Sequence, residues 1–373
     1  MPIRVVKSNN LQRETLRKMS NDSKLSDIKR RLAALKVAYS EDSKLLTACV
    51  NKLVNVERLY LKHLPTQTSG RWSTWVTNWP RVCINPKCQQ HLETVETRGY
   101  IEHEWTDKCW SIRDILKADD DEVLITWDHD NIEGRIHDLI VDDKHAIQAH
   151  AEGYDLHTLT CCDIFSMEYP QDKKNPHTSE VDSEWRSRYN WQGKDTKRRV
   201  LAKNFNHGSK YTESYRFVHR IQGIEQYGVS YRDLERLAKQ YITGKGAAWQ
   251  RKLDMMQRIR HERIARSLYG FRRVFFDSSP ETGREGFSHM VSATVSDYNN
   301  QTLILLEGKF TGFWRLLHNA HDGNKIAINK NYLKYDLDRS IETLKTDIKD
   351  IIERSIDYEG RSLIMTAGIK IFT

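Results

Sequence analysis

The sequence has no long apolar run, and its N-terminus has no apolar core. A membrane-spanning helix needs about 20 apolar residues in a row, and a secretory signal needs a shorter apolar stretch, so neither is predicted. We therefore expect a cytoplasmic protein, in its own cell or in a host, without a membrane partner. Cysteine is scarce, with six in 373 residues, and these thiols would be mostly reduced in the cytoplasm. Internal repeats and low-complexity tracts are also absent.

Three possible metal-ligand side chains lie close together in the sequence, at Cys83, Cys88 and His91. Thiolates and imidazoles are the usual ligands of structural zinc. The spacing Cys-x4-Cys-x2-His is not that of a standard zinc finger, so we do not expect zinc there. Cys161 and Cys162 lie in a predicted helix and are expected in the core.

Positive charge and aromatic rings are plentiful. The chain has 59 Lys and Arg against 51 Asp and Glu, a net charge of +8, with ten Trp and sixteen Tyr. A basic protein attracts polyanions, and aromatic rings between basic residues can stack on nucleic-acid bases. The same rings can also form an ordinary core, so the composition agrees with a nucleic-acid partner without requiring one.

One segment, residues 197–211, carries polar side chains at every fourth position. If it is helical, these side chains project from one gently spiralling face over about 18 Å. They are Arg199, Lys203, His207 and Tyr211. Two cations, an imidazole and a phenol in this order match a nucleoside triphosphate laid along a helix. The alternative is a solvated basic helix, because most Lys/Arg runs are exposed faces.

Two aspartates lie at the ends of predicted strands. Residues 123–127 form a short apolar run of strand type, and Asp128 follows it. Residues 314–329 are typical of a hairpin, with two apolar stretches around a polar turn and Asp322 at its tip. Carboxylates held in this way could bring a pair of Mg²⁺ ions near a phosphate. Asp is also common in ordinary turns, so the spacing alone does not decide.

Together these segments resemble motifs A, B and C of the family A DNA polymerases, the DNA polymerase I group. The first motif, D-x-x-x-I-E-x-R, is matched by Asp128, Ile132, Glu133 and Arg135. The second, R-x-x-x-K-x-x-x-[F/Y]-G-x-x-Y, is matched by Arg199, Lys203, Gly208 and Tyr211, with His207 at the aromatic position. The third, H-D-E, corresponds to His321, Asp322 and Gly323. Residues 68–73, 111–118, 152–157 and 267–276 resemble further family segments, in the family's order.

The resemblance runs from about Ser69 to Thr373 and implies an α+β fold of the right-hand polymerase type. Such a fold has an antiparallel palm sheet, helical fingers and a small helical thumb. The expected parts are an N-terminal segment and thumb (1–65), the first part of the palm (66–140), the fingers (141–275) and the second part of the palm (276–373). Within them we expect a long loop at 169–195, a helix near 337–356 and a final strand at 362–372.

The resemblance implies a template-directed DNA polymerase that adds dNTPs to a primer 3′ end by two-metal nucleotidyl transfer. Asp128 and Asp322 would ligate two Mg²⁺ ions, for which Mn²⁺ can substitute. Arg199 and Lys203 would hold the triphosphate and offset charge in the transition state. The primer–template would be contacted by Arg71, Arg284 and His321.

The resemblance also assigns four residues to the incoming nucleotide. His157 would donate a hydrogen bond to a phosphate oxygen, and Glu133 would block a 2′ hydroxyl. His207 stands in place of the aromatic ring that packs on the sugar and base. Tyr211 would occupy the position where the template base stacks.

The departures from the motifs leave alternatives. Gly323 replaces the third carboxylate, which predicts a weaker metal site rather than an inactive one. The chain could instead be a catalytically weakened DNA-binding subunit of a replication complex, or a related single-subunit RNA polymerase, although Glu133 argues against the latter. About 65 residues precede the palm motifs, so we expect no proofreading exonuclease domain. We expect a monomer of phage or mobile-element type, in a bacterial or phage-infected cell, with a separate exonuclease or processivity factor as a candidate partner.

Overall fold

The computed structural model describes residues 118–170, 183–191, 197–221, 224–319, 322–335 and 340–372, together with Ser69. These residues belong to one of two compact units, which comprises residues 63–73 and 118–373. The predicted thumb, Arg71, the three candidate zinc ligands at 83, 88 and 91, and His321 lie outside the described residues. The predicted domain boundaries therefore stay predictions.

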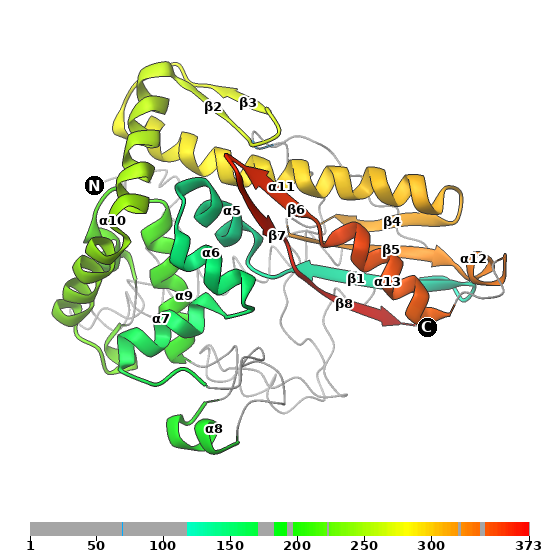
Figure 1. Cartoon of the computed structure of the whole chain (residues 1–373), viewed down its shortest axis with the longest axis horizontal. Helices are drawn as coiled ribbons and strands as arrows, with labels where there is room; N and C mark the ends of the chain where they lie inside the picture. Colours follow the sequence, from blue (N-terminus) through cyan, green and yellow to red (C-terminus); the bar gives the residue numbers. More distant parts are fainter. Residues whose placement is uncertain are drawn as a thin grey trace, which may run out of the picture. The chain divides into compact units, whose positions relative to one another are not determined.

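The centre of this unit is a four-stranded antiparallel sheet in the order β4-β5-β1-β8 (Figure 1). Its strands are β1 (Glu122–His129), β4 (Trp314–Asn319), β5 (Gly323–Asn329) and β8 (Ala367–Phe372). Val123, Ile125 and Trp127 of β1 are buried and the residues between them are less so, the period of two expected when one face of a sheet is covered. The pairing of β4 with β5 confirms the hairpin predicted at 314–329.

Two helices cover one face of the sheet. They are α11 (Pro280–Phe310) and α13 (Ile341–Ile352). Phe310 of α11 and Leu344 and Ile348 of α13 share a buried apolar cluster with the inward side chains of β1 and β5. Burying each such side chain contributes about 1.5–3 kcal/mol, so this layer holds the strands in place. Asp128 is one of the β1 residues on the other face of the sheet, and it is exposed.

The helical part follows β1 directly (Figure 1). Its helices are α5 (Ile132–Val141), α6 (Lys144–Ala151), α7 (Leu156–Phe165), α8 (Ser183–Tyr189), α9 (Lys197–Lys210) and α10 (Tyr231–Glu262), with short 3-10 helices η4 (Tyr215–Arg220) and η5 (Ile224–Tyr227). Aspartates cap two of them: Asp143 accepts from the amide of Ala146 (3.1 Å), and Asp155 accepts from that of Thr158 (2.9 Å). Helix α9 confirms the helix predicted at 197–211, and the buried Cys161 and Cys162 of α7 confirm their predicted place. No helix in the described part of the chain is long and apolar enough to cross a membrane.

The remaining elements are α12 (Lys330–Tyr335) and two small hairpins, β2 (Ile264–Arg266) with β3 (Arg272–Val274) and β6 (Ser355–Tyr358) with β7 (Arg361–Ile364). The single strand predicted at 362–372 is wrong: β7 and β8 belong to different sheets. Between them Met365 is buried, and its amide donates to the carbonyl of Arg354, which turns the chain from one sheet to the other.

The long loop predicted at 169–195 is also wrong in part, because it contains α8. Trp185 of this helix is buried against Trp191 and Cys161, and its indole nitrogen donates to the carbonyl of Glu168 (2.9 Å). Tertiary packing therefore stabilises a helix in a polar stretch. The helix predicted near 337–356 is observed as the shorter α13.

Candidate functional site

Asp128 and Asp322 lie beside each other where the β1–β5 pair ends. Asp128 is opposite Gly323 in the strand register, and the amide of His129 donates to the carbonyl of Asp322 with an N–O distance of 2.7 Å. Asp128 is exposed and Asp322 is half-buried. The structure thus brings together the backbones of the two aspartates that were predicted from the sequence to bind metal.

Asp128 is flanked by glycine on both neighbouring strands, Gly323 on β5 and Gly368 on β8. A Cβ at Gly323 would lie 2.2 Å from the carbonyl oxygen of Trp127, so no side chain fits there while the strands stay paired. A Cβ at Gly368 would meet open space. The first contact means that a side chain at residue 323 would force β1 and β5 to shift, whereas the open space at Gly368 leaves room beside Asp128.

Two lysines lie on the same face of the sheet as Asp128. Thr126, two residues earlier in β1, is paired with Lys325 of β5 and Lys370 of β8, and residues two apart in a strand share a face. Carboxylate oxygens suit a hard divalent cation, and ammonium groups nearby suit phosphate. Among the residues that the structure describes, no group of three or more His, Cys, Asp or Glu is placed to hold a metal ion.

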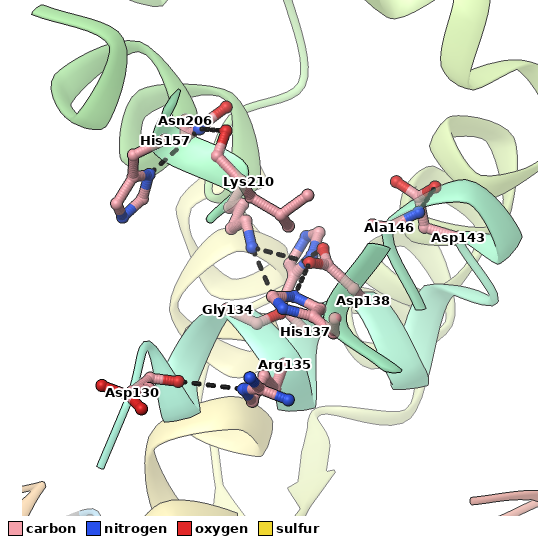
Figure 2. Close-up of polar contacts among 12 residues, drawn as sticks. Asp130, Gly134, Arg135, His137, Asp138, Asp143, Ala146, His157, Asn206 and Lys210 are labelled. Atoms are coloured by element: carbon pink, nitrogen blue, oxygen red, sulfur yellow. Dashed lines mark hydrogen bonds and ion pairs between the residues drawn. The ribbon is translucent and has the colours of Figure 1, made fainter. Parts of the chain in front are cut away.

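The turn from β1 into α5 is fixed by buried groups. His129 packs edge-on against Tyr298, with ring centroids 5.4 Å apart, and burial lowers its pKa to about 4. The buried guanidinium of Arg135 donates to the carbonyls of Asp130 and Ile364, each at 3.0 Å. Figure 2 shows the first of these bonds at the start of α5. Glu133 is thus carried on a helix whose first turn is anchored on two sides.

Arg199 and Lys203 on α9 have different environments. Arg199 is buried and makes a bidentate ion pair with Asp155, with Nε–Oδ2 and Nη2–Oδ1 distances of 2.8 and 2.9 Å. Asp155 is also the N-cap of α7, so the pair ties α9 to α7. Lys203, one turn later, is exposed. Of these two cations, Lys203 is therefore the one that reaches the solvent, and the predicted phosphate contact of Arg199 stays a prediction.

His157 of α7 and His207 of α9 lie close to each other, with ring centroids 5.7 Å apart. The amide of Asn206 donates to Nδ1 of His157 (3.1 Å), as Figure 2 shows. Burial lowers the pKa of His157 to about 3. The ring is therefore neutral at neutral pH, and Nε2 carries the proton when Nδ1 accepts this bond.

His207 lies near two cations and one carboxylate. Burial lowers its pKa, Lys210 and Lys203 lower it further, and Glu133 raises it. A neutral imidazole can pack against a sugar or base without the cost of burying a charge. The structure thus places Glu133, Lys203 and His207 within electrostatic reach of one another.

Tyr211 and Arg284 complete the predicted set within the described residues. Tyr211 follows α9, is half-buried and packs edge-on near His137, with ring centroids 6.4 Å apart. Arg284 lies in the second turn of α11 and forms an ion pair with Glu281. The assigned roles of both residues remain predictions.

The sequence analysis missed a buried ionic cluster beside α9. Asp138 of α5 accepts from Nδ1 of His137 (2.8 Å), from Nε2 of His150 (3.1 Å) and from Nζ of Lys210 (3.1 Å). Although burial alone would raise the pKa of Asp138, the Lys210 ammonium and the two histidine hydrogen bonds hold it well below its usual range. The available signal was a lone carboxylate inside the apolar run I-H-D-L-I-V of α5.

Comparisons with known proteins support the fold. No protein-family model matches the chain, and no curated protein sequence matches it significantly. The chain is similar in structure to the POL domain of Pol1 from M. smegmatis, solved in complex with DNA primer-template and dNTP, with a TM-score of 0.62 and 16% sequence identity. The match covers 97% of this chain and 56% of that one, so the chain spans little more than half of its length. The protein therefore has a mixed helix and strand fold with a small antiparallel sheet, similar to a DNA polymerase domain.

Proposed function

We propose that the protein is a template-directed DNA polymerase of the family A type, which adds dNTPs to a primer 3′ end. The observation that carries the proposal is that Asp128 and Asp322 lie next to each other where β1 and β5 pair, in a fold similar to a polymerase domain. The antiparallel sheet would be the palm, and α5 to α10 would form the fingers. The thumb is proposed from the sequence alone.

Two Mg²⁺ ions would activate the primer 3′ hydroxyl and neutralise phosphate charge when bound. Asp128 and Asp322 would hold them through carboxylate oxygens, and the open space at Gly368 beside Asp128 leaves room for substrate oxygens. Lys203 would contact the triphosphate from the exposed side of α9. Arg199 would join it by exchanging the Asp155 carboxylate for a phosphate, since both are anions that a guanidinium binds with two parallel hydrogen bonds.

The sugar and base would lie between α5 and α9. Glu133 would exclude a 2′ hydroxyl, the neutral ring of His207 would pack on the sugar, and His157 would donate to a phosphate oxygen. Tyr211 would hold the template-base position. Arg71, Arg284 and His321 remain the proposed contacts to primer–template DNA.

A second candidate function is a catalytically weakened DNA-binding subunit of a replication complex. Two observations favour it: Gly323 leaves no room for a third carboxylate, and Arg199 is engaged by Asp155. A single-subunit RNA polymerase is less well supported, because Glu133 would oppose a ribonucleotide. Cytoplasmic location, a monomeric state and a separate exonuclease or processivity factor remain proposals.

Primer extension tests the proposal. A labelled primer–template is incubated with Mg²⁺ and dNTPs, or with rNTPs, and wild type is compared with Asp128→Ala and Asp322→Ala. Both variants should lose extension while duplex binding changes little, because the carboxylates act on the ions rather than on the duplex. Asp357→Ala, which removes an exposed carboxylate from β6, serves as the matched control.

Extension with dNTPs that both site variants lose would support a working polymerase despite Gly323. Near-normal rates in either site variant would show that the metal assignment is wrong. Wild-type protein that binds DNA but extends nothing would favour the weakened subunit. Preferential use of rNTPs would favour the RNA polymerase.

A further inference from the structure

Lys210 forms a buried link between the end of α9 and the beginning of α5. Its ammonium donates to the carbonyl of Gly134 and to the carboxylate of Asp138, each at 3.1 Å, as Figure 2 shows. The side chains of Lys210 and Asp138 are 9% and 4% exposed. The loss of hydration offsets much of the attraction in a buried ion pair. The pair of Lys210 with Asp138 is therefore not explained by a gain in folding stability alone.

Asp138 cannot easily follow a movement of Lys210. His137 and His150, which come from α5 and α6, hold its two carboxylate oxygens from other directions. The first turn of α5 is also anchored, because Arg135 donates to the carbonyls of Asp130 and Ile364, each at 3.0 Å. The two acceptors of Lys210 are therefore held in place by contacts that do not involve Lys210.

Helix α9 is bound to α7 by other groups along its length. The ion pair of Arg199 with Asp155 lies near its beginning. Near its end, Asn206 bonds the carbonyl of Leu156 (3.3 Å) and the hydroxyl of Thr160 (3.1 Å). Helices α7 and α9 thus form one body, and Lys210 links that body to α5.

Both ends of this link lie next to residues of the proposed sugar pocket. Gly134 directly follows Glu133, and His207 is one helical turn before Lys210. Both Lys210 and Glu133 act on the pKa of His207, so the three side chains lie near one another. A change in the length of the link would change the gap between Glu133 and His207.

We propose that Lys210 is a positioning residue that sets the gap between Glu133 and His207, and through it the discrimination between deoxyribonucleotides and ribonucleotides. The inference rests on the proposed polymerase function, which it deepens. Lys210 itself does not touch the nucleotide. It acts by holding α9 at a fixed distance from the helix that carries Glu133.

The test removes the link without leaving an unpaired buried charge. The double variant Asp138→Asn/Lys210→Met replaces both ions by neutral side chains of similar size. The matched control is Lys252→Met: Lys252 is also buried and donates to carbonyls at the same end of α9, those of Ser209 and Thr212, each at 2.8 Å. Lys252 comes from α10, so its loss disturbs the helix end without removing the bonds from α9 to α5. Thermal unfolding of each variant shows whether it folds.

The measured quantity is the ratio of dNTP to rNTP incorporation efficiency. The double variant should lose about tenfold in this ratio, the scale on which one misplaced contact changes discrimination. Lys252→Met should keep the wild-type ratio even if its Tm falls. In a Glu133→Ala background the double variant should change the ratio no further, because the residue through which Lys210 acts is gone.

A folded, active double variant with wild-type sugar selectivity would overturn the role of Lys210. So would an equal loss of selectivity in Lys252→Met, or a further tenfold loss in the Glu133→Ala background, since either result would indicate general loosening. Wild-type protein that extends no primer would overturn the proposed function instead, and with it this inference. The two failures are therefore distinguishable.

Discussion

At the scale of single residues, the site depends as much on missing side chains as on those present. Gly323 and Gly368 flank Asp128 on the two strands paired with β1. They differ in what a side chain would meet: the carbonyl of Trp127 at 2.2 Å in one case and open space in the other. One glycine is required by the strand pairing, whereas the other only leaves room for a ligand.

We predict that Gly323→Ala destabilises the fold and Gly368→Ala does not. The methyl group at residue 323 must push β5 away from β1, which should cost about 1–3 kcal/mol, as overpacking usually does. Because that shift also separates Asp128 from Asp322, primer extension should fall with it. Urea unfolding of the two variants provides the measurement, and equal stability would show that β1 and β5 can separate without cost.

At the scale of elements, α9 presents its functional side chains in two ways. Its Arg199 faces α7 and is paired with Asp155, whereas Lys203 faces the solvent. In the proposed polymerase, Lys203 would therefore meet an arriving triphosphate first, and Arg199 only after it leaves Asp155. The two cations should contribute at different steps.

We predict that Lys203→Ala lowers the maximal extension rate by roughly 10²–10³-fold, the usual cost of removing one preorganised donor at developing charge. The affinity for primer–template should change little, because Lys203 is assigned to the nucleotide. Lys345→Ala, which removes an exposed lysine from α13, is the control for net charge. Single-turnover rates and DNA binding are measured on the same preparations. A parallel loss of rate and DNA affinity would place Lys203 on the duplex instead.

The elements that were predicted correctly are those whose sequence pattern lies within the element itself. The apolar run at 123–127 predicted β1, and the two apolar stretches of 314–329 predicted β4 and β5. The buried ionic contacts could not be found in this way, because Arg199 and Asp155 are 44 residues apart and Lys210 and Asp138 are 72 apart. The strand expected at 362–372 failed because Met365 is buried between β7, which pairs with β6, and β8, which pairs with β1. A period of two in the sequence does not reveal this break.

At the scale of the whole molecule, several imidazoles are buried in a neutral form. Burial lowers the pKa of His129 and of His137 to about 4 and that of His157 to about 3. In the unfolded chain the same groups have a pKa of about 6.5. The unfolded state therefore binds more protons than the folded state between pH 6.5 and pH 4.

We predict that stability falls as the pH is lowered through this range. Excess proton binding by the unfolded state favours unfolding, by at most about 2 kcal/mol at pH 5 for each of these histidines. Urea unfolding at pH 7 and pH 5 measures the change. His157→Asn should reduce the pH dependence, whereas replacement of the exposed His219 by Gln should leave it unchanged. Equal pH dependence in all three proteins would mean that His157 is protonated in the folded state.

The pairing of β1 with β5 also has a consequence for biosynthesis. Asp128 and Asp322 are separated by about 190 residues of chain. At a synthesis rate of about 5–20 residues per second, the ribosome needs roughly 10–40 s to deliver the second carboxylate after the first. Closing so long a loop before any contact is gained also slows folding. The proposed metal site could therefore form only after both halves of the sheet have met, and a truncated product that ends before β5 would lack Asp322.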